Sequence, residues 1–250
     1  MLVILASIYD ESARHLVELW GSLNASVLTC KDISSVAGWR NYLSDSTLST
    51  AVINGEKISN KQIDGVLTRL PYVTETELPH IVKHDRSYVA AEMMAFLVYW
   101  LSCLKCPVLN QPTPLCLLGP NWSQEQWIYT AAQIGIPVRS ICRQSSQSNI
   151  IRHATEDVSK VTVIVIGDRC FGAVNDEMEE QSMRLTREAG VDMLSVHFAA
   201  CEKGFLFIAA NLWFPVDTYN ISNAILDYFI RRHKKKNEYN TNREVFKQIT

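Results

Sequence analysis

The chain has 250 residues, of which 47% are hydrophobic and 20% charged, with a formal net charge of −2 at pH 7. This composition excludes a disordered chain, because so much apolar surface can form a substantial core, and the length corresponds to one or two domains. The nearly balanced charge gives no general attraction to nucleic acid. A basic run at 231–236 ends a predicted helix, where cations complement the helix dipole; a nucleic-acid or lipid patch is the alternative.

Seven cysteines are scattered through hydrophobic segments, and no signal peptide is recognised ahead of them. Reduced thiols in a cytoplasmic protein are therefore expected. Cys103 and Cys106 have the spacing of a metal or redox pair, but no second pair accompanies them at zinc-finger spacing, which favours structural thiols. The apolar stretch at 89–104 contains Glu92 and is shorter than the roughly 20 residues that span a bilayer, so no membrane association is expected.

Short apolar runs predict the strands of the first half of the chain, and these are 2–7, 26–30, 50–54, 65–69 and 107–110. Helical periodicity follows the first run, with Leu16, Leu19, Trp20 and Leu23 on one face. The spacing favours a parallel α/β sheet over an all-β sandwich. The strongest helix signal covers 87–104, which is apolar nearly all round and should therefore lie against the sheet.

The second half alternates again. Ser123 and Gln126 have capping-box spacing, so a helix begins there and stops near Gly135. The next predicted elements are a strand at 136–138, a loop at 142–149, a hairpin at 161–173 that turns at 167–168, a helix at 176–189, and strands at 193–199 and 204–210. A final amphipathic helix at 217–233 carries Ile221, Ile225, Tyr228 and Phe229 on one face.

Several of these segments carry a family resemblance. The first block contains 64–69, then Asp85, Tyr88 and Glu92 on the long helix, and then 107–112. The later segments are 127–138, which ends in G-I-P-V, then 163–173 and 189–211. In this order they resemble ATP-grasp carboxylate–amine ligases, in the branch of ribosomal-protein glutamate ligases, glutathione synthetase-like enzymes and peptide-modifying ligases.

The resemblance implies an α/β fold in two lobes. A parallel-sheet pre-ATP-grasp domain is expected at 1–112, and a truncated, largely antiparallel ATP-grasp-derived α+β domain at 113–236. A polar tail at 237–250 follows.

The resemblance also shows what this chain lacks. The family keeps acidic magnesium ligands at the ends of the last strand pair, but here those positions hold His197 and Ala209, and only Asn211 and Pro215 match. A hard divalent cation needs carboxylate oxygens, so neither a metal ion nor another cofactor is expected, and no residue is assigned a catalytic role.

The nucleotide clamp is missing as well. The family inserts a subdomain with two phosphate-binding lysines between the two blocks, but only about twenty residues separate them here. Lys160 is the sole lysine between Lys105 and Lys203. Phosphoryl transfer needs cations beside the phosphates, so the resemblance implies a scaffold without its catalytic residues.

Four residues are candidates for ligand binding: Arg69, Tyr88, His197 and Asn211. Arg69 follows a predicted strand, at the carboxyl end where ligands of parallel sheets bind; the alternative is a buried network with Asp85, Tyr88 and Glu92. His197 is either a hydrogen-bonded core histidine or a cleft residue. Asn211 is either a turn former or a retained cleft residue.

The leading hypothesis is a catalytically inactive accessory subunit that binds a peptide or a partner enzyme as a homo- or hetero-oligomer. Four aromatic residues are its interface candidates: Trp122, Trp127, Trp213 and Phe214. The alternatives are an ATP-dependent ligase completed by another chain, an enzyme that uses His197 with a nearby thiol, and a small-molecule sensor. No nucleic-acid or membrane partner is expected.

Overall fold

The computed structural model describes residues 1–36, 38–42, 48–139, 160–202 and 204–232. They form two compact units. The first consists of Met1–Pro120 and the chain from Pro215 onward, and the second of Asn121–Phe214. The chain therefore leaves the first unit and later returns to it.

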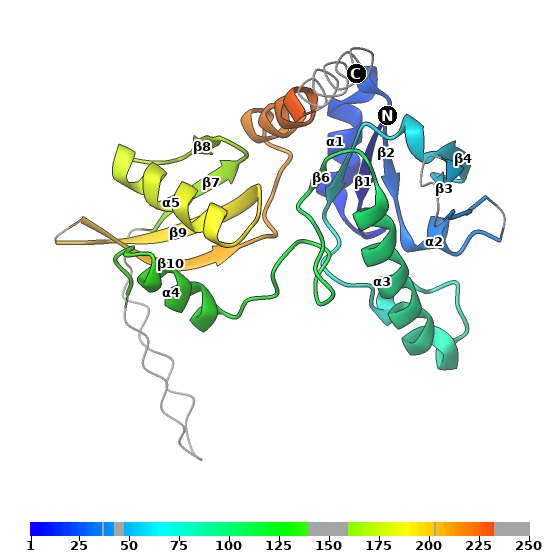
Figure 1. Cartoon of the computed structure of the whole chain (residues 1–250), viewed down its shortest axis with the longest axis horizontal. Helices are drawn as coiled ribbons and strands as arrows, with labels where there is room; N and C mark the ends of the chain where they lie inside the picture. The colour runs from blue at the N-terminus through cyan, green and yellow to red at the C-terminus, as the bar shows by residue number, and fades with distance from the viewer. Residues whose placement is uncertain (37, 43–47, 140–159, 203, 233–250) are drawn as a thin grey trace, which may run out of the picture. The chain divides into compact units, whose positions relative to one another are not determined.

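A parallel sheet forms the centre of the first unit, as predicted. Its strands are β1 (Leu2–Leu5), β2 (Ala25–Leu28), β5 (Gly65–Thr68) and β6 (Val108–Leu109), in the order β2-β1-β5-β6 (Figure 1). Its helices are α1 (Glu11–Leu19), α2 (Cys30–Ile33) and α3 (Arg86–Cys103), with short 3₁₀ helices η1 (Gly21–Leu23), η3 (Asn60–Gln62), η4 (Glu75–Glu77) and η5 (Lys83–Asp85).

The predicted strand at 50–54 exists but lies outside this sheet. β3 (Thr50–Ile53) pairs antiparallel with β4 (Glu56–Ser59) in a sheet of two strands. Asn54 and Gly55, which connect them, both have positive φ, at 51° and 77°. A two-residue turn of this kind sends the chain straight back, so β3 meets its neighbour in sequence before it can join the parallel sheet.

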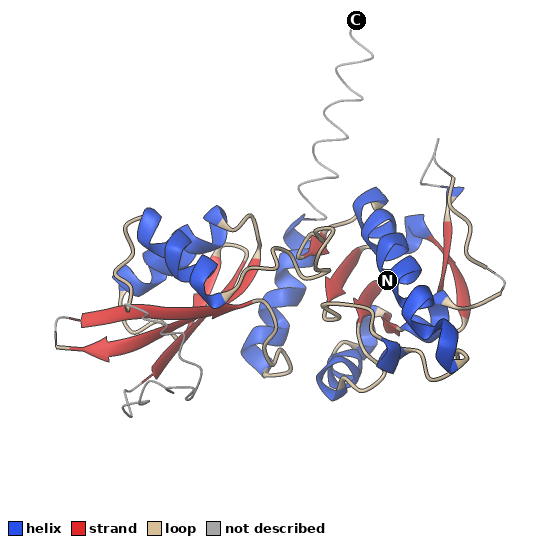
Figure 2. Cartoon of the chain, turned by 90° about the horizontal axis from the view of Figure 1, so that it is seen from below, coloured by secondary structure: helices blue, strands red, loops and turns tan. Residues whose placement is uncertain are grey.

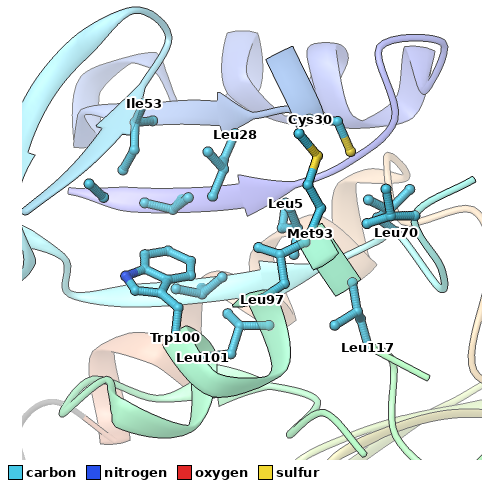
Figure 3. Close-up of a cluster of buried hydrophobic side chains, with 14 of the residues drawn as sticks. Leu5, Leu28, Cys30, Ile53, Leu70, Met93, Leu97, Trp100, Leu101 and Leu117 are labelled. Atoms are coloured by element: carbon cyan, nitrogen blue, oxygen red, sulfur yellow. The ribbon is translucent and has the colours of Figure 1, made fainter. Parts of the chain in front are cut away.

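Helix α3 packs against the parallel sheet through one buried side, as Figure 3 shows for Leu97, Trp100 and Leu101. Leu5 and Leu28 meet them from the sheet. The prediction that the long helix lies against the sheet is confirmed, although only one of its sides is buried.

The final helix, at 219–232, packs on the first unit, near Trp20 at the end of α1 and Gly65 at the start of β5. The Nε1–H of Trp20 donates a buried hydrogen bond of 2.9 Å to Ser222 Oγ. The ring of Phe229 lies so close to Gly65 that a Cβ at that position would be 2.4 Å from Cδ1. The sequence prediction grouped this helix with the second domain, at 113–236, whereas its apolar face completes the core of the first unit.

The second unit is an antiparallel sheet covered by two helices. Its strands are β7 (Lys160–Ile166), β8 (Arg169–Phe171), β9 (Met193–Cys201) and β10 (Gly204–Asn211), in the order β10-β9-β7-β8. Helices α4 (Gln124–Gln133) and α5 (Asp176–Glu188) lie on the same face of this sheet (Figure 2). The predicted hairpin at 161–173 and the predicted strands at 193–199 and 204–210 are present, and they form one antiparallel sheet.

Local signals place the helix ends. Ser123 and Gln126 form the predicted capping box of α4, and Gly190, with φ of +64°, follows the end of α5.

The predicted strand at 136–138 is reduced to a single parallel bridge between Val138 and Phe207. The predicted loop at 142–149 and tail at 237–250 lie outside the described residues. Among the helices that the structure describes, none combines the length and the hydropathy needed to cross a membrane.

Candidate functional site

Strands β9 and β10 bring together the positions that the sequence singled out. His197 on β9 lies directly opposite Ala209 on β10 and opposite Thr162 on β7. Asn211 lies opposite Ser195, two residues along β9 from His197. The two positions that should hold acidic residues in the ATP-grasp resemblance are therefore cross-strand neighbours.

These residues lie on the sheet face turned away from α4 and α5. Val196, Phe198 and Phe207 are completely buried, and the two phenyl rings pack edge to face at 6.2 Å. Side chains alternate between the two faces of a strand, so His197 points to the opposite face from its neighbours Val196 and Phe198. Because the helices cover one face and Thr162 remains exposed, the completely buried set faces the helices.

His197 lies between two hydroxyl groups. Its Nδ1 is 3.0 Å from Thr162 Oγ1, and its Nε2 is 3.4 Å from Ser195 Oγ. Burial, and then the charge of Lys160, lowers the pKa of His197 below its ordinary value, so the imidazole is neutral at pH 7. A neutral ring can donate from one nitrogen and accept at the other, which suits two hydroxyl partners. His197 is thus a hydrogen-bonded sheet residue on a partly open face.

Asn211 is engaged in a local turn. Its Oδ1 accepts a hydrogen bond of 3.0 Å from the backbone N–H of Trp213, two residues later. This arrangement is an Asx turn, in which the side chain imitates a backbone carbonyl. Of the two roles considered for Asn211, the structure shows the turn former, with its amide oxygen bonded to Trp213 N.

No family model matches the sequence, and no curated protein matches it. Solved structures do. The macrocyclase MdnC from Microcystis aeruginosa, bound with precursor peptide MdnA, aligns over 92% of this chain and 100% of its own, with a TM-score of 0.65 and 12% identity. A RiPP-associated ATP-grasp ligase of Chryseobacterium gregarium, in complex with ADP and a leader and core peptide, aligns over 93% and 98%, with a TM-score of 0.68 and 12% identity.

The ATP-grasp ligase PsnB, complexed with precursor peptide PsnA2 and AMPPNP, aligns over 93% of this chain and 97% of its own, with a TM-score of 0.63 and 13% identity. The chain has the ATP-grasp fold. At these identities the likeness concerns the fold, and the chemistry must be judged from this chain's own residues.

The magnesium ions that an ATP-grasp ligase uses do not fit the residues of this site. His197 and Ala209 offer one imidazole and one methyl group, and Asn211 Oδ1 is bonded to Trp213 N. Within the described residues there is no group of three or more His, Cys, Asp or Glu side chains placed to hold a metal ion. In ATP sites magnesium is held by one or two carboxylates together with water and phosphate oxygens, and this strand pair offers no carboxylate, so its residues do not fit a magnesium ion.

In the first unit, Arg69 follows β5 at the carboxyl edge of the parallel sheet, as predicted. Its guanidinium is buried and bonds to Asp10, with Nε 2.7 Å from Oδ2 and Nη2 3.3 Å from Oδ1. The alternative network with the polar row of α3 is wrong, because Asp85 and Glu92 are exposed and Tyr88 is 70% exposed. Asp10 is the partner because β1 and β5 are adjacent parallel strands and the residues that follow them meet at one edge.

The four aromatic interface candidates differ in exposure. Trp213 is 48% exposed, whereas Trp127 and Phe214 are buried. Trp122 is half-buried and packs edge to face on Trp127, with ring centroids 4.7 Å apart. Trp213 is therefore the member of this set that presents most surface to a partner.

Sequence reasoning missed a hollow of about 700 Å³ at the ends of the two helices of the second unit. Its lining consists of Gln133, Ile134, Gly135, Arg184, Arg187 and Glu188. The Arg184 guanidinium bonds to the backbone carbonyl of Ile134, which follows α4. Both arginines lie at helix C-termini, where unpaired carbonyls carry partial negative charge. Capping of these helix ends therefore explains why the arginines line the hollow.

Proposed function

We propose that this chain is a peptide-binding accessory protein that has the ATP-grasp fold and does not itself catalyse ligation. The observation that carries the proposal is the cross-strand pair of His197 and Ala209, which replaces carboxylates by a neutral imidazole and a methyl group. Without carboxylates, this strand pair cannot hold the magnesium that neutralises the phosphates of ATP.

Peptide binding is supported by the solved structures that share the fold. The MdnC structure contains a precursor peptide, and the Chryseobacterium gregarium ligase contains a leader and core peptide. A chain that keeps this fold and lacks the metal ligands can still bind a peptide. The proposed partner is therefore a peptide, or an enzyme that acts on it.

Catalysis is tested first. The isolated chain is incubated with ATP and magnesium, and phosphate release is measured against a sample without protein; we expect no difference. His197→Ala and His15→Ala are prepared in parallel, because His15 is an exposed histidine of the first unit and serves as the matched control. ATP hydrolysis by the wild-type chain that is lost in His197→Ala and kept in His15→Ala would overturn the proposal.

Binding is tested second. The probes are fluorescein-labelled peptides encoded by the open reading frames next to the gene for this chain, and anisotropy reports their binding. We expect at least one peptide to bind, and we expect calorimetry to detect no binding of ATP. An ATP affinity of roughly 100 μM or tighter, about −5.5 kcal/mol, without peptide binding would favour the rival hypothesis of a ligase completed by another chain.

We also propose that the protein works as a homo- or hetero-oligomer, with the exposed Trp213 as an anchor. Sedimentation of wild type and Trp213→Ala at micromolar concentration tests this. Tyr129→Ala is the matched control, because Tyr129 is 66% exposed in the same unit. A wild-type chain that sediments as a monomer and recovers no partner from its native lysate contradicts the proposal.

A further inference from the structure

The parallel sheet of the first unit has a reversal of strand order between β1 and β5. From β1 the chain moves to β2 on one side, and β5 lies on the other side. Ligands of open α/β sheets bind outside the carboxyl ends of the strands at such a reversal. In this chain Ser7 follows β1, and Arg69 and then Glu77 follow β5.

Glu77 is a buried carboxylate at this edge, 7% exposed. Its Oε1 accepts a hydrogen bond of 2.7 Å from Ser7 Oγ. Its Oε2 is also buried and has no hydrogen-bond partner among the described residues. A buried carboxylate oxygen without a donor destabilises the fold, and native structures satisfy most such oxygens with a protein group, a water molecule or an ion. The edge therefore has an acceptor for which the described residues supply no donor.

The charges around Glu77 favour a cation. Asp10 and Glu77 carry two negative charges, and Arg69 carries one positive charge that is already bonded to Asp10. Glu77 also acts on Cys30: burial raises the pKa of that thiol to about 12, and the charges of Glu77 and Asp32 add to the effect. Such a surplus of negative charge attracts a cation and repels a phosphate or carboxylate.

Aromatic side chains flank the same edge. Tyr9, two residues after Ser7, is 65% exposed, and Tyr72, three residues after Arg69, is 40% exposed. The face of a tyrosine ring attracts ammonium groups through its quadrupole. The two loops that follow β1 and β5 thus each present a ring suited to a cationic ligand.

We propose that the carboxyl edge between β1 and β5 binds a primary ammonium group, which donates a hydrogen bond to Oε2 of Glu77. The ammonium supplies both the missing donor and the missing positive charge, and it belongs to a lysine side chain or to the N-terminus of a peptide. Glu77 ends the short helix η4, whose other residues, Glu75 and Thr76, are exposed, so a small movement of this surface turn admits the ligand. This site lies in the first unit and is separate from the β9–β10 strand pair.

Three short peptides test the proposal by titration, followed by amide chemical shifts. Acetyl-Gly-Lys-Gly-amide carries a side-chain ammonium, Gly-Gly-Gly-amide carries an N-terminal ammonium, and acetyl-Gly-Gly-Gly-amide carries none. We expect one or both charged peptides to bind and to shift the amides of Ser7, Tyr9 and Glu77, and the neutral peptide to shift none. Which charged peptide binds identifies the source of the ammonium.

Glu77→Gln and Glu75→Gln form a matched pair of variants, since both remove one charge from η4 but Glu75 is exposed. Loss of a charge-assisted hydrogen bond should weaken binding about tenfold or more in Glu77→Gln and leave Glu75→Gln within about twofold of wild type. Tyr9→Ala should weaken binding about two- to fivefold. The two Glu variants keep the size of the side chain, and circular dichroism checks their fold.

The proposal is overturned if the neutral peptide binds as well as the charged ones, or if no peptide shifts the amides at this edge. Equal losses in Glu77→Gln and Glu75→Gln would also overturn it, because they would show a general charge effect. None of these outcomes depends on ATP hydrolysis or on the labelled peptides from neighbouring open reading frames, so failure here and failure of the proposed function are distinguishable.

Discussion

The contact between Gly65 and Phe229 allows a quantitative test of where the final helix packs. A Cβ added to Gly65 would lie 2.4 Å from Cδ1, 2.8 Å from Cε1 and 3.0 Å from Cγ of the phenyl ring. Real Cβ atoms do not approach other atoms this closely, so in Gly65→Ala the ring or the helix must move. Phe229 itself is only 3% exposed, so Phe229→Ala removes a buried ring.

The expected magnitudes follow from these contacts. Overpacking destabilises the fold by about 1–3 kcal/mol. Replacing glycine stabilises it by about 0.4–1 kcal/mol, because the unfolded chain loses conformational freedom, so Gly65→Ala should lower the free energy of unfolding by about 1–2 kcal/mol. Phe229→Ala should lose about 3–5 kcal/mol. In the double variant the new methyl group occupies space that the ring has left, so the overpacking cost disappears. The coupling energy should be about 1–3 kcal/mol in favour of the double variant.

Urea denaturation, followed by circular dichroism, gives the free energies of unfolding of the wild type, the two single variants and the double variant. Because a protein with two units need not unfold in one step, hydrogen exchange of peptides from the first unit assigns the transition to that unit. Gly21→Ala is the control, because its Cβ would meet nothing within 4 Å. We expect this control to be near wild type. Additive losses in the double variant would refute the packing of Phe229 on Gly65 and with it the assignment of the helix to the first unit.

Three further predictions concern ionisable groups. Burial raises the pKa of Cys30 to about 12, so Cys30 should resist iodoacetamide in the folded protein while the exposed Cys201 reacts; peptide mass mapping that finds equal labelling contradicts this. Burial and then the charge of Lys160 lower the pKa of His197 in the folded protein. As the pH falls below the unfolded histidine pKa of about 6.5, the unfolded chain binds more protons than the folded one, so the stability present above that pH is lost on acidification. His197→Gln should flatten this dependence in denaturation curves, and an unchanged slope would show that other groups cause it. His197→Asp with Ala209→Glu should gain weak magnesium binding in calorimetry, since the pair is cross-strand, but no ATP turnover; turnover would show that the fold alone supplies the remaining catalytic groups.

Local patterns in the sequence were sufficient for most elements. The capping box at Ser123, the glycine after α5 and the apolar run of β7 each depend on near neighbours in the chain, and each lies where it was predicted. The order and spacing of the β9 and β10 segments identified His197 and Ala209 as the positions of the missing acids, but their pairing is a finding of the structure, since the register shifts between Phe207 and Ala209.

Other features of the site could not be read from the chain. Arg69 is separated by 59 residues from its partner Asp10, and the row on α3 offered a nearer set of polar groups. Glu77 carried no motif, and its importance depends on the burial of Oε2, which is a property of the folded unit. Burial and pairing at a sheet edge result from many distant contacts, so no short window of sequence contains them.

The sequence by itself determined the α/β class, most helix ends and the turns, because these follow from the chemistry of adjacent residues, and its resemblance to ATP-grasp ligases pointed to the loss of carboxylates at the last strand pair. The tertiary structure decided that the final helix returns to the first unit and that Arg69 bonds to Asp10. Each of these outcomes is one of several possible contacts between residues far apart in the chain. Which contact forms depends on which apolar surfaces can be buried together in one fold.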